Sequence, residues 1–221
     1  FVQQKKYKSA LRQVIALDKR NKQMGARVLE MAKICIENSQ YDVAITAYEY
    51  VVDLGTENLN ILAGEEGLIN ALYLKTTKSI KTDPTEIAGL IQKIQDFVDS
   101  NGKDYRTANS LYRLAELQIF YNNNVGVGIS ILEDVIQTPR LKASFLAESK
   151  LLLGDAYLMQ NNIWDAKLMY GQVDKQFKED AYGQEAKFKN AKLSYYTGDF
   201  EWATGQLDIL KTATTQLISN N

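Results

Sequence analysis

Residue types that usually perform acid–base or nucleophilic chemistry are scarce in this chain. Its 221 residues include no histidine, and histidine is both the commonest general base and the commonest metal ligand in proteins. A single cysteine, Cys35, excludes an internal disulfide and a zinc site built from several thiolates. Because Cys35 falls on the apolar face of an expected helix, we interpret it as a small buried hydrophobe rather than a reactive thiol.

Pairs of carboxylates occur, but their spacing does not bring them together. Glu65 and Glu66 are adjacent on an expected helix, so their side chains point about 100° apart. Gly126-Val127-Gly128 lacks both the third glycine of a dinucleotide-binding loop and the Lys-Ser/Thr of a P-loop. The sequence therefore predicts a protein that is not an enzyme, with no catalytic residue, no metal site and no cofactor.

Charge is unevenly distributed along a chain that has 26 Lys and Arg against 27 Asp and Glu. Residues 1–27 contain eight Lys or Arg residues, with Asp18 as their single acidic residue. Such a segment can indicate nucleic acid or an anionic membrane, but a nucleic-acid platform would interleave more aromatics than Phe1 and Tyr7. We interpret the segment as a solvated face, or as a face for a preceding part of a longer chain, and expect no nucleic-acid partner.

The composition is that of a folded protein without a membrane span. Hydrophobic residues make up 45% of the chain and charged residues 24%, which is too apolar for a disordered chain. No apolar run reaches the roughly 18 to 20 residues that a membrane-spanning helix needs. Because the chain begins with Phe1 rather than Met, we expect it to be a fragment of a longer chain.

Apolar residues recur at the spacing of a helix through most of the chain. Between Tyr41 and Leu54, for example, Val43, Ala47 and Val51 fall on one helix face. Thr82-Asp83-Pro84 is typical of a helix start, because Asp caps a helix and Pro suits its first turn. The sequence predicts eleven helices, near residues 4–20, 24–38, 41–54, 58–76, 84–100, 104–122, 125–137, 142–160, 163–178, 181–197 and 200–218.

Three stretches of the chain align with one another without gaps. In each, a small residue on one helix precedes a small residue on the next helix by 12 positions, and large apolar residues follow. The small residues suit the closest approach of two paired helices, and the large ones fill the gap toward the next pair. The aligned positions are Ala32, Ala44, Tyr48 and Val51; Gly154, Ala166, Tyr170 and Val173; and Ala191, Ala203, Leu207 and Leu210.

This repetition resembles the tetratricopeptide repeat (TPR) family. Leu153-Gly154, Tyr157, Ala166 and Tyr170 give the best match to the family's motif. The resemblance implies an all-α fold, an α-α superhelix (TPR-like solenoid) of about five helix pairs after a single N-terminal helix. We expect one such solenoid over residues 1–221, with residues 4–20 as the second helix of a truncated repeat. The five repeats are expected near 24–54, 58–100, 104–137, 142–178 and 181–218.

Residues 60–100 match the repeat pattern least well. Either Gly67 or Ala71 could be the small residue of that repeat, and the segment from Lys75 to Asp83 is longer than the family's connections. The stretch from Glu185 to Ala203 is also similar to repeats of bacterial cell-envelope proteins. On that similarity we expect a bacterial protein of the periplasm or cell envelope rather than the cytoplasm.

The resemblance also implies a groove, because the first helix of each pair lines the concave surface in TPR proteins. The expected inward positions lie one and five residues after the small residue, with Tyr112 and Phe188 added from the preceding turn. These partner-binding positions are Lys33, Glu37, Tyr112, Glu116, Phe120, Asp155, Met159, Phe188, Lys192 and Tyr196. Their mixture of aromatic and charged side chains suits a peptide or a partner helix, and an ordinary solvated face is the alternative.

Three functions follow from this pattern. The first is a non-enzymatic scaffold that binds a peptide or partner protein on the concave face of the solenoid. The second is a structural spacer or self-association segment of a larger bacterial envelope protein. The third is an enzyme hosted by the solenoid, against which the absence of histidine weighs. The Lys/Asn clamp with which some TPR modules hold chaperone tails is absent, since its Asn position holds Lys33, Glu116, Asp155 or Lys192.

Overall fold

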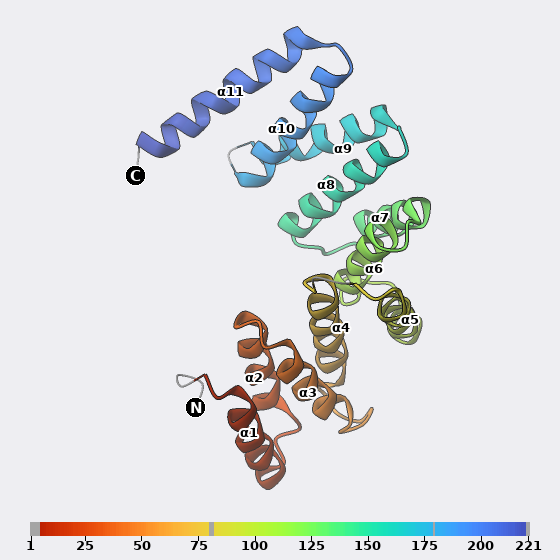
Figure 1. Cartoon of the computed structure of the whole chain (residues 1–221), viewed down its shortest axis with the longest axis vertical. Helices are drawn as coiled ribbons and strands as arrows, with labels where there is room; N and C mark the ends of the chain where they lie inside the picture. Colours follow the sequence, from red (N-terminus) through yellow and green to blue (C-terminus); the bar gives the residue numbers. More distant parts are fainter. Residues whose placement is uncertain (1–4, 80–81, 179, 220–221) are drawn as a thin grey trace. The chain divides into compact units, whose positions relative to one another are not determined.

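The structure is a computed structural model that describes residues 5–79, 82–178 and 180–219, with side chains as far as Thr212. Phe1 of the basic segment and Gln4 of the expected first helix lie outside the described residues. Eleven α-helices account for the regular secondary structure of the described part (Figure 1), so the predicted helix number and the all-α class are confirmed. They are α1 (Tyr7–Asn21), α2 (Ala26–Glu37), α3 (Tyr41–Val52), α4 (Ile61–Thr77), α5 (Pro84–Asn101), α6 (Ala108–Phe120), α7 (Val125–Gln137), α8 (Ala143–Met159), α9 (Ile163–Gln176), α10 (Ala181–Tyr196) and α11 (Phe200–Ser219).

The helix ends follow from local chemistry. Asp83 caps α5 by accepting a hydrogen bond from the Thr85 backbone amide, and Pro84 occupies the first turn, as the sequence predicts. The helix expected from residue 104 begins instead at Ala108, because residues 104–107 form a turn. In that turn the Arg106 amide donates to the Asp104 carboxylate, and the Thr107 hydroxyl donates to the Gly102 carbonyl. Side chains that bind nearby backbone groups compete with helix formation in this way.

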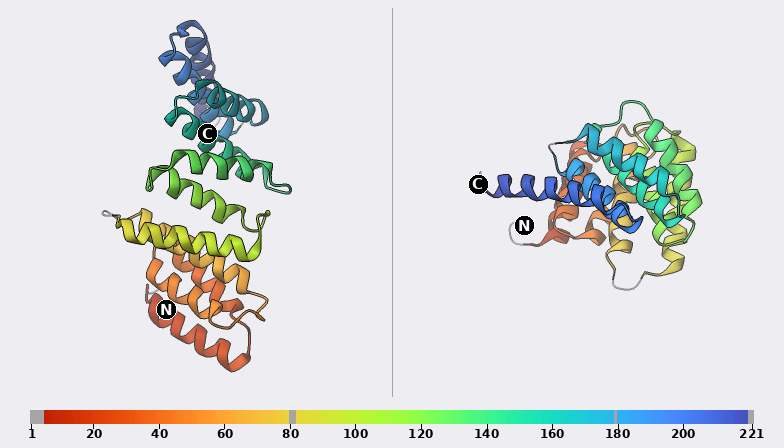
Figure 2. Two further views of the ribbon diagram at one scale, coloured as in Figure 1. Left: turned by 90° about the vertical axis from the view of Figure 1, so that its right-hand side faces the viewer. Right: turned by 90° about the horizontal axis from the view of Figure 1, so that it is seen from above.

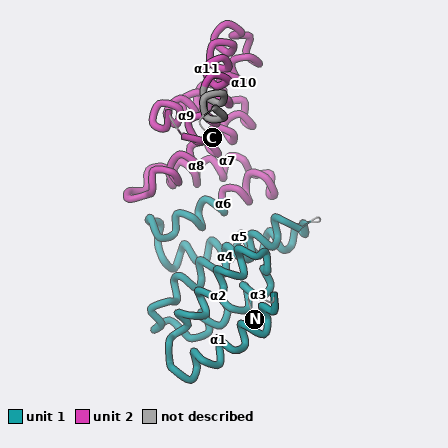
Figure 3. The backbone as a smooth tube through the Cα atoms, turned by 90° about the vertical axis from the view of Figure 1, so that its left-hand side faces the viewer, with its two compact units in different colours: residues 1–114 teal, residues 115–221 magenta. Residues whose placement is uncertain are grey.

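The chain divides into two compact units, Phe1–Leu114 and Ala115–Asn221 (Figure 3). The boundary falls within α6. Unit 1 holds α1 to α5 and the beginning of α6, and unit 2 holds the rest of α6 and α7 to α11.

In unit 1, helices that follow one another in the sequence pack side by side, α2 against α3 and α3 against α4 (Figure 2). Their shared core is apolar, and its fully buried members are Val28, Ala32, Cys35, Ala44, Ala47, Val51 and Ala71. Burial raises the pKa of the Cys35 thiol to about 11, so the thiol stays protonated at neutral pH. The interpretation of Cys35 as a buried hydrophobe is confirmed.

Gly67 of α4 lies close against α3. A Cβ atom at position 67 would overlap the ring of Tyr48, which packs directly over the glycine. Ala71 is also fully buried, but it carries its Cβ without difficulty. The two candidates for the small residue therefore have different roles, and Gly67 alone admits an aromatic ring against the helix backbone.

In unit 2, α9 packs between α8 and α10. Tyr170 is the largest fully buried side chain, and it lies among Ala147, Leu151, Ala166, Val173 and Ala186. A Cβ atom at Gly154 would overlap the Tyr170 ring, just as one at Gly128 would overlap Ile119. Both glycines therefore permit close helix packing, which is the role that the repeat pattern assigns to Gly154.

Candidate functional site

A hollow of about 500 Å³ opens on unit 1 above Tyr48 of α3. Its walls come from α2 and α4, and the first turns of α6 close one side. Charged and amide side chains dominate the rim, namely Lys33, Glu37, Glu66, Asn70, Asn109 and Arg113. The floor is apolar, with Leu29 and Ile36 beside the Tyr48 ring.

Contacts between elements organise this rim. The Asn109 amide donates to the Glu66 carboxylate over 3.1 Å, which joins α6 to α4. The Arg113 guanidinium lies 4.5 Å from the centre of the Tyr73 ring, within the range of a cation–π contact. Burial, followed by the charges of Cys35 and Glu66, raises the pKa of the Tyr48 phenol, so its hydroxyl remains neutral. The hollow thus offers hydrogen-bond donors and both signs of charge around an aromatic floor.

A second hollow, of about 510 Å³, opens on unit 2 above Tyr170 of α9. Asp155 and Leu158 of α8 form one wall, and α10 forms the other. The α10 residues are Glu185, Phe188, Lys189, Lys192, Leu193 and Tyr196.

Asp155 fixes the base of this second hollow. It accepts a hydrogen bond from the Tyr170 hydroxyl over 2.7 Å, and it forms an ion pair with Lys189 over 2.6 Å. Lys189 in turn lies 3.4 Å from Glu185, one helical turn away. Burial, reinforced by the hydrogen bond to Asp155, raises the pKa of Tyr170. The carboxylates of Asp155 and Glu185 together neutralise the charge of Lys189.

The two hollows occupy equivalent places in their units. Residue 33 corresponds to residue 155, a separation of 122 residues, and the same separation relates seven lining positions of one hollow to seven of the other. The pairs are Lys33 and Asp155, Ile36 and Leu158, Tyr48 and Tyr170, Ala63 and Glu185, Glu66 and Phe188, Gly67 and Lys189, and Asn70 and Lys192. The tyrosine of the floor is retained, whereas the rim changes from Lys33 and Glu66 to Asp155 and Phe188.

Solved structures share this arrangement of helices. TPR-like repeats of a Podosopora anserina protein described as a kinesin light chain are 16% identical, with a TM-score of 0.68 over 87% of this chain and 95% of that one. The TPR protein YrrB is 12% identical, with a TM-score of 0.61 over 90% and 91% of the two chains. MamA from Desulfovibrio magneticus RS-1 is 10% identical, with a TM-score of 0.64 over 87% and 96%. This chain has a TPR-like fold.

The TPR-like fold could be predicted from the sequence because the spacing of small and large residues follows the repeat pattern, although sequence identity to the solved structures is low. No protein-family model matches the chain, and neither does any curated protein. The similarity therefore concerns the arrangement of helices, which confirms the resemblance to TPR repeats and the predicted fold class.

Six of the ten predicted groove residues line the two hollows of the TPR-like fold. Lys33 and Glu37 line the hollow of unit 1, and Asp155, Phe188, Lys192 and Tyr196 line that of unit 2. Phe188 is 52% exposed and Tyr196 73% exposed, so both offer apolar surface to a ligand. The one-and-five spacing thus places side chains at hollows in both units, and their role in binding stays a prediction.

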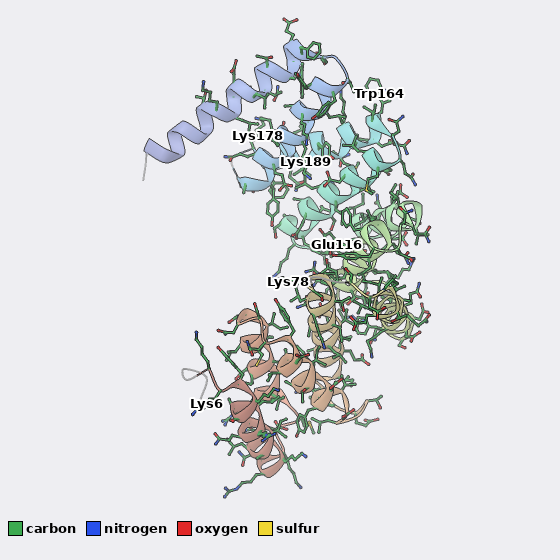
Figure 4. All side chains as sticks on the ribbon, viewed as in Figure 1. Lys6, Lys78, Glu116, Trp164, Lys178 and Lys189 are labelled. Atoms are coloured by element: carbon green, nitrogen blue, oxygen red, sulfur yellow. The ribbon has the colours of Figure 1, made fainter. Side chains whose placement is uncertain are left out.

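The other four predicted residues line neither hollow. Tyr112 is buried, with the Arg113 guanidinium 5.7 Å from its ring, so it presents little surface. Glu116 is half-buried on α6 (Figure 4), while Phe120 and Met159 are exposed at the ends of α6 and α8.

Several lining residues were not predicted from the sequence. Glu66 and Asn70 were missed because the register of residues 60–100 was ambiguous, and Asn109 because it lies outside the inward positions that the repeat pattern assigns. Glu185 and Lys189 carried a usable signal, since opposite charges four residues apart on a helix commonly pair.

The residues that the structure describes contain no group of three or more His, Cys, Asp or Glu side chains placed to hold a metal ion. No described helix combines the length and the apolar character that crossing a membrane requires.

Proposed function

We propose that this chain is a non-enzymatic scaffold for protein–protein interaction, which binds peptide segments of partner proteins on the first helices of its pairs. The observation that carries this proposal is the presence of two hollows at equivalent positions, one in each unit. The two hollows share a tyrosine floor but differ in their rim residues. Such repetition allows one fold to recognise different side chains of a ligand.

The chemistry of the rims supports a peptide as the ligand. In unit 2, Phe188, Lys192 and Tyr196 follow one another at four-residue intervals along α10 and so share one helix face. Lys192 makes no ion pair within the described residues, whereas Lys189 beside it is held by Asp155 and Glu185. A segment carrying an apolar side chain next to a carboxylate would fill the space between the aromatic residues and pair with Lys192.

The fold neighbours agree with a scaffold role. YrrB is described as a TPR protein with an unusual peptide-binding site. We extend peptide binding to this chain as part of the proposal, and we place its ligands at the two hollows.

A peptide-display selection on the immobilised chain tests the proposal, followed by affinity measurements with the selected peptides. We expect unit 2 to select peptides that combine acidic and apolar residues. Phe188→Ala with Tyr196→Ala should weaken binding at least tenfold, because large aromatic anchors carry most of the energy of such interfaces. Trp164→Ala with Leu168→Ala is the matched control, since these α9 side chains are exposed but line no hollow.

A charge reversal sharpens the same experiment. Lys192→Glu should shift the selected peptides from acidic to basic, whereas Lys175→Glu, an exposed lysine of α9 outside the hollow, should leave the selection unchanged. The proposal for unit 2 would be overturned if the selected peptides stayed the same in Lys192→Glu and bound equally well to Phe188→Ala with Tyr196→Ala.

Self-association is a second candidate, because α11 exposes apolar residues on its surface. Trp202 and Ile209 lie seven residues apart on one face of α11 and are 41% and 51% exposed, and clustered exposed apolar residues mark interaction surfaces. Sedimentation velocity over a wide concentration range distinguishes this candidate. A monomer at every concentration would remove it, and dimers lost in Trp202→Ser with Ile209→Ser would establish it. The location of the protein in a bacterial cell envelope stays a prediction from sequence similarity.

A further inference from the structure

The start of unit 1 is a strongly basic surface without internal neutralisation. Eight cations lie between residues 5 and 27, all of them exposed: Lys5, Lys6, Lys8, Arg12, Lys19, Arg20, Lys22 and Arg27. Within the described residues none of the eight makes an ion pair. Figure 4 shows Lys6 at the start of α1, projecting away from the helices.

The single acidic residue of this stretch is engaged elsewhere. Asp18 is buried, where it accepts hydrogen bonds from the Gly25 backbone amide at 3.0 Å and from the Tyr50 hydroxyl at 3.0 Å. Its carboxylate ties the turn after α1 to α3, at the base of a hollow that Lys19 and Lys22 also line. Lys8, Arg12 and Lys19 are spaced four and seven residues apart on α1, so they share one face of the helix.

The basic face leads to an exposed apolar edge. The connections α1–α2 and α3–α4 lie together there, joined by a 2.9 Å hydrogen bond from the Asn60 side-chain amide to the Met24 carbonyl. Between them they expose Met24 by 54%, Leu54 by 41% and Leu59 by 92%. Such surface on three neighbouring side chains is uncommon unless something covers it.

Lysines and apolar residues meet at a hollow of about 360 Å³ on this edge. Lys19 and Lys22 line it together with Met24, Tyr50 and Leu54, and Glu57 is the exposed acid on its rim. Lys22 and Met24 hold positive φ angles of 52° and 51°, a conformation that non-glycine residues adopt at some cost. The α1–α2 connection thus places the side chains of Lys22 and Met24 at the exposed apolar edge.

We infer that unit 1 binds the surface of an anionic phospholipid bilayer through α1 and the two connections, defined here as the membrane edge. The cations would face lipid phosphates and carboxylates, while Leu59, Met24 and Leu54 enter the boundary between headgroups and acyl chains. Nucleic acid fits this surface less well, because Tyr7 is buried and the Tyr50 ring is covered by Lys19, 5.6 Å from its centre. Neither aromatic ring is then free to stack on a base.

The membrane edge and the two hollows share no lining residue, so either can fail without the other. Binding of the whole chain to vesicles tests the inference. The vesicles are phosphatidylcholine alone and phosphatidylcholine mixed with phosphatidylserine, each at low and high salt. We expect co-sedimentation with the anionic vesicles only, and release at high salt, because screening removes the attraction between exposed charges.

Variants separate charge from apolar insertion. Lys8→Gln with Arg12→Gln should lower the vesicle partition coefficient by more than tenfold, since each cation near an anionic surface contributes about fivefold. Leu59→Ser should lower it by several-fold without affecting folding, because the side chain is almost fully exposed. The matched controls in unit 2, Lys175→Gln with Lys178→Gln and Leu168→Ser, should bind like the unchanged chain.

Two outcomes overturn the inference. One is an absence of binding to anionic vesicles, with or without capture of a single-stranded oligonucleotide by the same surface. The other is vesicle binding that the membrane-edge variants reduce no more than their controls do.

Discussion

Glycine positions show how single residues set the spacing of the helices. Gly154 and Gly67 each lie against a tyrosine ring, so the ring from the neighbouring helix packs directly on the backbone of the helix that carries the glycine. Gly171 on α9 has no heavy atom within 4 Å of the place where its Cβ would stand. The same residue type is therefore required in one helix and dispensable in the next.

Replacing Gly154 tests this distinction. Gly154→Val should lower the free energy of unfolding by about 1–3 kcal/mol, because the added carbons overlap the buried Tyr170 ring. Gly171→Ala should instead raise it, by up to about 1 kcal/mol, through helix propensity alone. Chemical denaturation followed by circular dichroism measures both changes. Equal effects of the two substitutions would show that the ring contact is not limiting.

Three tyrosines with raised pKa values predict instability of the folded protein at high pH. Burial raises the pKa of Tyr50 to about 12, and burial also raises those of Tyr157 and Tyr170, which donate to Glu133 and Asp155. A raised folded-state pKa means that the unfolded phenol ionises first, near pH 10. Stability is therefore fully present below about pH 10 and falls above it, by at most about 1.4 kcal/mol per pH unit for each tyrosine.

Unfolding measured as a function of pH checks this expectation. Tyr170→Phe should flatten the alkaline decline, although it also leaves Asp155 with one partner fewer. Tyr196→Phe, at an exposed position, should leave the decline unchanged. An alkaline limb that is the same in both variants would contradict the assignment to Tyr170.

At the scale of the elements, helix positions followed from the sequence where turn chemistry was explicit. The helices expected at 125–137 and from residue 84 begin where predicted, because Asn-rich turns and the Asp83-Pro84 start are local signals. The expected start at residue 104 was wrong because the Asp104–Thr107 turn satisfies its own backbone through side chains. The apolar spacing on either side of this turn continues as in a helix. It therefore does not show that side chains have replaced the helical hydrogen bonds within the turn.

The cap of α5 is a direct test at this scale. Asp83→Ala should lower the free energy of unfolding by about 1 kcal/mol, since the Thr85 amide loses its acceptor. Asp83→Asn, which retains a side-chain oxygen, should cost only a fraction of that. Thermal unfolding compares the two variants, and equal losses would assign the effect to charge rather than to capping.

The hollows show which parts of a site require tertiary information. Lys33, Asp155 and Lys192 could be predicted, because each follows the small residue of a helix by a fixed number of positions. Glu66, Asn109 and Arg113 could not be predicted, because their rim combines α4 and α6 across a long and irregular connection. A repeat pattern thus predicts residues within one helix better than it predicts which helices share a rim.

At the scale of the whole molecule, α1 to α5 in unit 1 and α7 to α11 in unit 2 pack mainly on the helices next to them in sequence. In such a protein a local defect is expected to stay local, because stability is a sum of neighbour contacts. Hydrogen exchange of Gly154→Val should therefore show lost protection in α8, α9 and α10 and unchanged protection in α2, α3 and α4. Uniform loss of protection in both units would show that the chain unfolds as one cooperative body.

The burial of Cys35 has a practical consequence for such experiments. The chain carries one thiol, which is inaccessible in the folded state and protonated at neutral pH, so maleimides and disulfide reagents should not modify it. A cysteine introduced at Leu59 or Trp164 would then accept a fluorophore or spin label selectively in an otherwise unaltered background. Such a label reports on membrane depth at the first position, and on the environment of the outer face of α9 at the second.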